Sequence, residues 1–272
     1  MVTAVTITMR AMELIDIGCN LTHDSFDSDR DAVIQAAHEA GVVQMIVTGA
    51  SAEGSLAALE LAQKWPQQIF ATAGVHPHRA SEYSSDTDSL IRELSENDAV
   101  VAIGETGLDY FRDFSPRNAQ RSSFEQQIQI AIDSGLPFFL HQRDAHDDFV
   151  AILKEYRDKL NAVVVHCFTG SKPELYECLD MDCHIGITGW ICDERRGTHM
   201  KEFMQDIPSD RLMIETDSPY LKPRNLRPKL KSHRNEPRLL PWILGTLAAC
   251  RNEHPQSLAE ATTRNARAFF RL

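Results

Sequence analysis

Eight short apolar runs alternate with segments of helical periodicity along almost the whole chain, and no other feature limits its fold as strongly. Apolar runs of this length predict strands buried on both faces, and the segments between them predict helices. Parallel strands joined by helices build either an open doubly wound sheet or a closed barrel. The predicted strands cover residues 12–17, 42–48, 69–75, 100–104, 137–140, 162–165, 183–187 and 211–214.

The segments between these runs carry the usual residues of helix boundaries. Pro116 and Pro173 stand near predicted helix starts, and Gly41 and Gly135 follow predicted helix ends. The predicted helices cover residues 29–40, 51–64, 86–96, 116–134, 146–160, 172–181, 198–206, 237–251 and 255–270.

The turn after the first strand separates the two candidate folds. A doubly wound sheet usually has a G-x-G-x-x-G phosphate loop there, whereas this chain has DIGCN at residues 16–20. Metal-binding residue types also follow the fourth, fifth, sixth and eighth strands, and a closed barrel brings those strand ends to one place. The sequence therefore predicts an α/β fold, a (β/α)8 TIM barrel. Without repeats or linkers, a single domain is expected over residues 1–272.

Composition limits the classes of function. The formal net charge of −11 argues against a protein that coats nucleic acid non-specifically, but it leaves a nuclease possible because local charge decides binding. No apolar run reaches the roughly 18 residues of a membrane span, so no membrane partner is expected. The N-terminus lacks the basic start and cleavage site of a signal peptide. The six cysteines show no C-x-x-C spacing, which predicts reduced thiols in a cytoplasmic protein.

Four polar side chains at predicted strand ends can bind a metal ion. Glu105 follows VVAIG, His141 follows PFFL, His166 follows AVVV and Asp217 follows LMIET. Each has an ordinary explanation when taken alone: a loop glutamate, a satisfied core histidine or an aspartate that caps a turn. Their recurrence favours a shared centre, because all strand ends of a barrel meet at one mouth. Mixed imidazole and carboxylate ligands fit Zn²⁺, Mn²⁺ or Fe²⁺ better than an all-oxygen Mg²⁺ site.

The same residues suggest catalytic roles. Glu105 could bridge two cations, which would then hold both the attacking and the leaving oxygen. Asp217 could bind metal, orient water or accept a proton. Arg143, two residues beyond His141, could hold a phosphate with its fork of donors, and His76 follows the third strand closely enough to contact substrate.

Positive charge and aromatic rings follow the last strands. The loop at residues 223–238 carries six lysines and arginines, Tyr220 shortly precedes it, and Trp190 follows the seventh predicted strand. Cations beside a metal centre suit a polyanionic substrate, and aromatic rings suit the bases of a single strand. A solvated surface loop is the alternative interpretation.

Longer motifs around these positions resemble one known family. AGVHPH, AIGETGLDY, FFLHQRDAH, VVHCFTG and ETDSPYL, in this order, together resemble the TatD family of metal-dependent deoxyribonucleases over residues 14–270. The resemblance implies a TIM barrel of the metal-dependent hydrolase superfamily, a divalent cation and hydrolysis of phosphodiester bonds. ITGWICDERRG and RNEP are similar to the branch that gives the family its name. That similarity implies a 3′-to-5′ exonuclease on single-stranded DNA or RNA, with Mg²⁺ and a cytoplasmic location.

The resemblance also assigns roles to residues. Glu105 would be the bridging ligand, His141 and His166 would complete one metal site, and Asp217 would serve a second site or hold the nucleophilic water. Weaker candidates for substrate contact are His76, Arg143 and Asp109.

One segment departs from the family pattern. Most members open with D-x-H-x-H, but Gly18 and Asn20 occupy the two histidine positions here. Asn20 offers a carbonyl oxygen and Gly18 offers no side chain. We therefore expect the site of Glu105, His141 and His166 to persist and the second site to be weak, filled only with substrate, or absent. Mg²⁺, which keeps several of its waters, would tolerate such a depleted site better than Zn²⁺.

Two other functions stay open at this stage. An ester or amide hydrolase of the same superfamily, acting for example on aminoacyl-RNA, would use the same activated water. Such enzymes typically have H-x-H and a carboxylated lysine, neither of which this chain has. A metal-binding scaffold that lost catalysis is the second alternative, although it would have no need for an open water position. A monomer is expected in each case.

Overall fold

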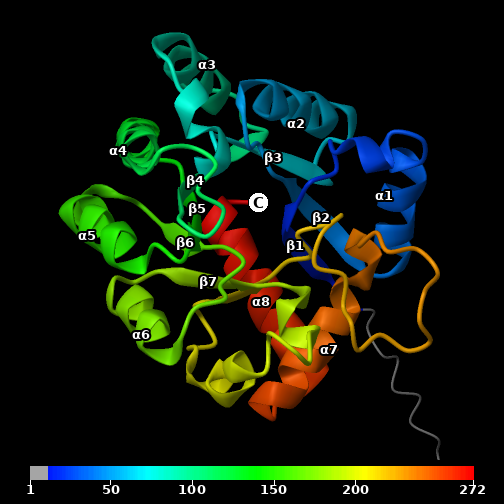
Figure 1. Ribbon diagram of the computed structural model, residues 1–272. Coiled ribbons are helices and arrows are strands. Elements are labelled where there is room, and N and C mark those ends of the chain that lie inside the picture. The colour runs from blue at the N-terminus through cyan, green and yellow to red at the C-terminus, as the bar shows by residue number, and fades with distance from the viewer. Residues whose placement is uncertain (1–11) are drawn as a thin grey trace, which may run out of the picture.

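The computed structural model describes residues 12–272, and its eight strands run parallel in one sheet in sequence order (Figure 1). The TIM-barrel prediction is confirmed. Residues 1–11 of the N-terminal segment that was considered as a signal peptide lie outside the described residues. The strands are β1 (Leu14–Cys19), β2 (Val42–Val47), β3 (Ile69–Ala73), β4 (Val100–Asp109), β5 (Phe138–Arg143), β6 (Val163–Val165), β7 (His184–Ile187) and β8 (Leu212–Ile214).

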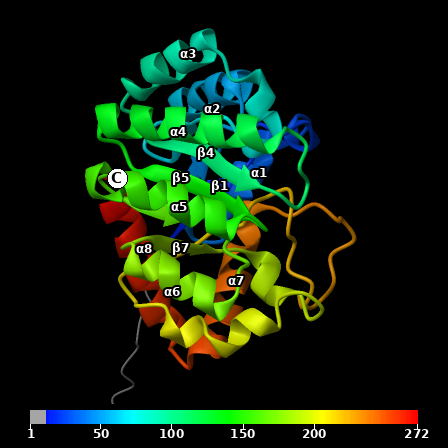
Figure 2. The same cartoon turned by 60° about the vertical axis from the view of Figure 1, so that its left-hand side comes forward.

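Helices surround the barrel and connect its strands (Figures 1 and 2). None of those within residues 12–272 has the length and apolar character that would let it cross a bilayer. The helices are α1 (Arg30–Glu39), α2 (Ala52–Lys64), α3 (Ser85–Ser95), α4 (Arg117–Ser134), α5 (His146–Tyr156), α6 (Lys172–Asp180), α7 (Leu240–Arg251) and α8 (Pro255–Phe270).

The helix predicted over residues 198–206 is wrong. The segment forms two short 3-10 helices, His199–Glu202 and Met204–Asp206, and the backbone leaves helical geometry at Phe203, where φ is −130°. Met200, Phe203 and Met204 are buried, and the second of these 3-10 helices packs against α7. Tertiary packing of these apolar side chains accompanies the irregular local backbone.

Strands β4 and β5 extend further than their apolar runs. Their register continues to the pair of Asp109 and Arg143, so Glu105 and His141 lie inside strands rather than after them. Gly104 and Gly107 flank Glu105 with φ of +136° and +139°, and a side chain at either position would collide with the β5 backbone. These glycines allow β4 to stay paired while it presents Glu105 to the mouth of the barrel.

The barrel interior and the helical shell form separate apolar cores. The inner core contains residues from the strands, such as Ile17, Phe139 and Met213, together with Phe269 and Phe270 from the end of α8. Asn265 of α8 donates hydrogen bonds to the carbonyl oxygens of Ser209 and Leu212, at the start of β8. Helix α8 therefore closes the amino end of the barrel and leaves the carboxyl end for polar groups.

The seam between β8 and β1 is closed partly by a side chain. Asp217 N donates to Gly18 O at 2.8 Å and Asn20 N donates to Ser218 O at 2.7 Å. Below these bonds, the buried Asp16 carboxylate accepts from the backbone N–H and the hydroxyl of Thr216, at 2.8 and 2.5 Å. Burial raises the pKa of Asp16 to about 8, against the opposing effect of these hydrogen bonds.

Candidate metal centre

Three imidazoles converge on one buried carboxylate at the carboxyl end of the barrel. Glu105 Oε1 lies 2.8 Å from His166 Nε2, 3.0 Å from His141 Nδ1 and 3.4 Å from His76 Nε2. One ligand atom each from His76, Glu105 and His141 lies within 4.8 Å of the others, a spacing that fits a metal ion. The structure thus brings three of the four predicted ligands together and adds His76, which was predicted as a substrate contact.

Strand geometry explains this convergence. Glu105 belongs to β4, His141 to β5 and His166 directly follows β6, so three adjacent strands each contribute one side chain. His76 is the residue before a 3-10 helix that opens at Pro77, and its Nδ1 accepts a hydrogen bond from the backbone N–H of His78. That bond leaves Nε2 of His76 directed toward Glu105.

Asp109 forms a second polar layer beside this cluster. Its Oδ2 lies 2.7 Å from His78 Nε2 and 3.3 Å from His141 Nε2. Burial alone would raise the pKa of Asp109, but the contacts with the two imidazoles outweigh it and hold this pKa well below its usual range. His141 therefore lies between two carboxylates, Glu105 and Asp109, and this arrangement fixes its ring orientation.

Asp217 lies at the seam, across the mouth from β4. Asn20 Nδ2 donates to its Oδ1 at 3.0 Å, and within residues 12–272 no hydrogen bond joins Asp217 to Glu105. Its backbone is left-handed, with φ of +52°, a conformation uncommon outside glycine and best tolerated by Asn and Asp. Burial raises the pKa of Asp217 to about 7, so the carboxyl can take up or release a proton near neutral pH.

Glu215 is fully buried beneath His166 and was missed by the sequence analysis. Its Oε2 lies 3.1 Å from His166 Nδ1, and its Oε1 accepts from the backbone N–H of Cys167 at 2.5 Å. A carboxylate on the far nitrogen of a metal-binding histidine orients the ring and increases its basicity. The strand-end rule could have revealed it, because Glu215 directly follows the apolar strand β8 just as His166 directly follows β6.

Glu215 also restricts position 18. A Cβ at Gly18 would collide with Glu215 Oε2, so this carboxylate occupies the space that a side chain there would enter. Asn20, at the other histidine position, holds Asp217 instead. The DIGCN segment therefore has a structural role at the seam.

The histidines and carboxylates of the centre shift one another's pKa values. Burial alone would lower the pKa of His166, but Glu215 and Glu105 outweigh it and hold the value well above the ordinary range. Burial alone would raise the pKa of Glu105, yet the surrounding imidazoles keep it well below its usual value. Burial lowers the pKa of His76 to about 4.

These donors fit a divalent cation. Three imidazole nitrogens around an ionised carboxylate match the ligands of Zn²⁺, Mn²⁺ or Fe²⁺, and the oxygens of Asp109 and Asp217 extend the choice toward harder ions. The fit supports a metal centre typical of this kind of site without selecting the metal.

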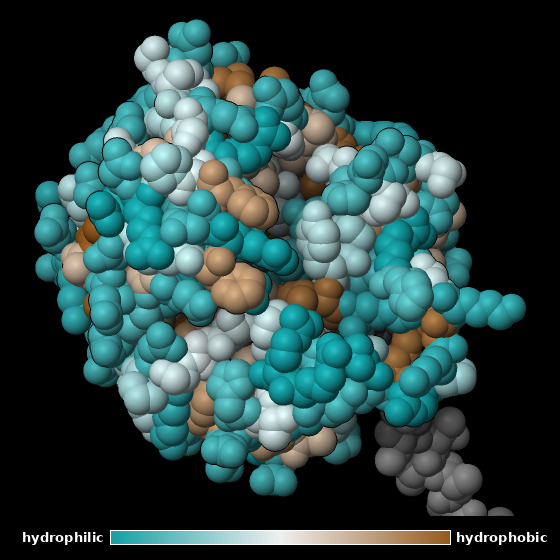
Figure 3. Space-filling view, in the orientation of Figure 1, coloured by the Kyte–Doolittle hydropathy of each residue, from teal (hydrophilic) through white to brown (hydrophobic). Residues whose placement is uncertain are grey.

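Arg143 stands at the rim of the centre, at the end of β5. Its guanidinium lies 4.0 Å from the ring centroid of Phe111 and 5.4 Å from that of Trp190. Phe111 is half exposed although it is a large apolar residue. Figure 3 shows this face of the molecule, where a hollow lies near the centre and apolar side chains occur among hydrophilic ones.

Sequence comparison agrees with this arrangement. The family model described as TatD related DNase matches residues 15–271. A protein from Erwinia tasmaniensis named 3′-5′ ssDNA/RNA exonuclease TatD is 50% identical over 259 residues, which cover 95% of this chain and 100% of the relative. A protein of the same name from Pantoea ananatis is 48% identical, with the same coverage.

Solved structures show the same fold. A TatD homologue from Escherichia coli K12 superposes with a TM-score of 0.88 at 28% identity, covering 97% of this chain and all of that one. A guanine deaminase from C. acetobutylicum, with a TM-score of 0.56 at 10% identity over 96% of this chain and 73% of its own, shares the barrel alone. Together with the family match, the identity to curated relatives is decisive: the chain belongs to the TatD family of DNases.

Proposed function

We propose that this protein is a metal-dependent 3′-5′ exonuclease that hydrolyses phosphodiester bonds in single-stranded DNA and RNA, with a role in DNA repair or turnover. The observation that carries the proposal is the convergence of three imidazoles on the Glu105 carboxylate at the barrel mouth. The names of relatives that are about half identical over their full length support the substrate and the direction.

Glu105, His141 and His166 would hold the cation, with His76 close enough to assist and Asp217 available from the seam. Mg²⁺ is the proposed metal, with Mn²⁺ or Zn²⁺ as alternatives, and one firm site is expected because Gly18 contributes no ligand. A divalent cation at this position would supply Lewis-acid activation of water and of a phosphoryl oxygen.

The chain's own residues would do the rest. Asp217, whose carboxylate is held by Asn20 at the seam, would orient the attacking water and accept its proton. Arg143 would hold the phosphoryl oxygens with its guanidinium and stabilise the charge that develops on them. His76 and Asp109, beside the predicted ligands, would position the substrate at the rim.

Three further features belong to the proposal. Residues 1–272 would act as one nuclease domain, as a monomer, in the cytoplasm. The described cysteines support the location, because none of the six forms a disulfide and most of them are buried.

The first test is a gel assay on a single-stranded oligonucleotide labelled at its 5′ end. Purified protein would be incubated with Mg²⁺, with Mn²⁺ or with EDTA, beside the Glu105→Ala variant. A metal-dependent ladder that shortens stepwise from the 3′ end, and that disappears in the variant, is expected. Cleavage that persists in EDTA, or an undiminished ladder from Glu105→Ala, would contradict the assignment.

A further inference from the structure

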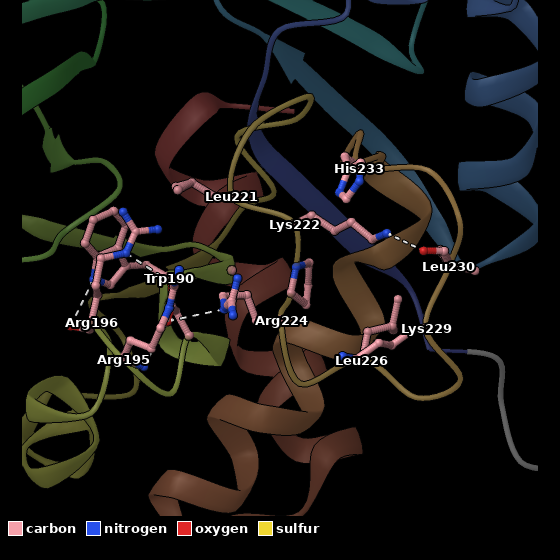
Figure 4. A pocket seen from close by; sticks show the side chains of 13 residues that line it. Trp190, Arg195, Arg196, Leu221, Lys222, Arg224, Leu226, Lys229, Leu230 and His233 are labelled. Carbon is pink, nitrogen blue, oxygen red and sulfur yellow. Dashed lines mark hydrogen bonds and ion pairs between the residues drawn. The ribbon is translucent and has the colours of Figure 1, made fainter.

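A basic pocket lies beside the candidate metal centre, and the metal-binding and catalytic roles proposed above use none of the residues that line it. Its volume is about 390 Å³, and it is formed by the segments that follow the neighbouring strands β7 and β8 (Figure 4). Both segments leave carboxyl ends of strands, so the pocket opens on the same face as the metal centre. Figure 2 shows the loop after β8 on the side toward which β4 and β5 run.

The charge of the pocket contrasts with that of the chain. The protein carries a formal charge of −11, yet five basic side chains and one carboxylate, that of Asp193, line this pocket. A local excess of cations in an acidic protein attracts an anionic ligand to that place. The basic side chains are Arg195, Arg196, Lys222, Arg224 and Lys229.

Asp193 fixes the arginines without neutralising all of them. Its buried carboxylate lies 3.3 Å from Arg195 and 3.1 Å from Arg196, while Arg224 is 3.6 Å away and also pairs with Glu194. The three arginine side chains are nonetheless 43–58% exposed. Each guanidinium is thus held at one edge and has donors free for a ligand, which preorganises the site for phosphate oxygens.

The two lysines complete the positive surface. Lys222 Nζ donates to the carbonyl oxygens of Leu230 and Ser232, and within the described residues no carboxylate pairs with Lys222 or Lys229. Figure 4 shows Lys222 and His233 on the side of the pocket opposite Trp190 and the arginines. The pocket can therefore contact an extended anion from two sides.

A row of alternating cations and aromatic rings joins the pocket to the metal centre. Arg196 lies 4.2 Å from the centroid of Trp190, which is 5.4 Å from Arg143, which is 4.0 Å from Phe111. Arg143 ends the strand that carries His141. Rings in such a row offer stacking surfaces for bases, and the cations between them face a sugar-phosphate backbone.

We infer that this pocket binds the uncleaved 5′ part of a single strand through its backbone phosphates while the 3′-terminal nucleotide occupies the metal centre. Trp190 and Phe111 stack bases along the way. This inference rests on the proposed exonuclease function and adds a binding site that acts on long substrates and not on short ones. Contacts of this kind are sequence-independent and sensitive to salt.

The test uses the double variant Lys222→Ala/Lys229→Ala. The matched control is Lys154→Ala/Lys159→Ala, which removes the same charge from exposed positions on the outer side of the barrel. With a ten-nucleotide substrate, we expect the pocket variant to raise KM about tenfold at low salt with kcat unchanged. The slope of log affinity against log salt should become shallower by about 1.4, the value for two lost contacts to a single strand. Cleavage of a dinucleotide should be unchanged.

A binding measurement without catalysis separates this inference from the proposed function. Fluorescence anisotropy with labelled dT10 in EDTA should show binding by the wild type and the control, and weaker binding by the pocket variant. If the wild type cleaves the dinucleotide but the pocket variant binds dT10 as tightly as the control, the inference is overturned while the exonuclease stands. If the wild type cleaves nothing yet binds dT10 through these lysines, the proposed function fails and the binding site remains. No binding of dT10 by the wild type overturns the site itself.

Discussion

The two ends of the barrel place histidines in opposite surroundings. At the carboxyl end, His166 lies between Glu105 and Glu215, and their carboxylates outweigh its burial so that its pKa is raised well above the usual value. At the amino end, His184 packs against Phe269 with ring centroids 5.0 Å apart, and burial together with Arg211 lowers its pKa to about 4. Charged groups therefore lie at the carboxyl end of the barrel (the mouth), whereas burial at its amino end (the base) disfavours a charged histidine.

The largest effect on turnover is expected when the Glu105 carboxylate at the barrel mouth is removed. Glu105→Gln keeps the volume of the side chain but takes away the carboxylate that three imidazoles surround, so metal binding should fail. We expect exonuclease turnover to fall by at least about a thousandfold, as for other groups that stabilise the transition state. Turnover and metal content by elemental analysis would be measured beside Glu60→Gln, an exposed control on α2. Full metal content with an undiminished rate would contradict the central role of Glu105.

The second prediction concerns the amino end of the barrel, where a substitution should lower stability without changing the turnover of the folded protein. Phe270→Ala empties a site that is 2% exposed in the inner core and should lower the free energy of unfolding by about 3–5 kcal/mol. The half-exposed Phe111 gives the control, because Phe111→Ala should leave the unfolding free energy almost unchanged. Urea unfolding measures both, and turnover per folded Phe270→Ala molecule should match the wild type. A selective loss of turnover would mean that the two ends are coupled.

The third effect is a pH dependence at the base. The unfolded chain protonates His184 near its usual pKa of 6.5, but the folded protein does so only near 4, so stability falls as the pH drops through this window. Between pH 7 and pH 4.5, the unfolding free energy of the wild type should fall by on the order of 2 kcal/mol more than that of His184→Gln. The exposed control His254→Asn should follow the wild type. Parallel curves for wild type and His184→Gln would refute the burial argument.

The smallest effect is expected when the hydrogen bond from Asn20 to Asp217 at the seam is removed. Asn20→Ala removes one hydrogen bond to the Asp217 carboxylate and should lower turnover by about five- to tenfold, the equivalent of about 1 kcal/mol. The same variant should keep its unfolding free energy close to that of the wild type, since Asn20 is only partly buried. Equal turnover in both proteins would show that Asp217 does not depend on this bond.

Much of the fold could be predicted because each buried strand is an apolar run that ends near a polar residue. Ending each strand at its first polar residue placed the ends of β4 and β5 too early. Glu105 and Asp109 are polar, yet they remain paired within the sheet while they face the barrel mouth. The 3-10 segment over residues 198–206 was misjudged because its apolar spacing suits an α-helix equally well.

The candidate site was only partly predictable for a related reason. Strand ends could be expected to meet, and the structure places Glu105, His141 and His166 together. Which neighbour supports them depends on side-chain direction across strands that are distant in sequence. Glu215 was therefore missed, and the roles of the site residues remain predictions for the experiments above.

The hydrogen bonds between Asp16 and Thr216 join residues that are 200 positions apart, and they have a consequence for synthesis. Domains form largely in the order in which a ribosome releases them, and contacts between distant parts of a chain form late. Until β8 and α8 have emerged, β1 has an unpaired edge and the inner core has no cover beneath it. Glu105, His141 and His166 leave the ribosome well before Asp217, so a nascent chain carries most of its metal ligands before it can hold substrate between the two sides of the mouth.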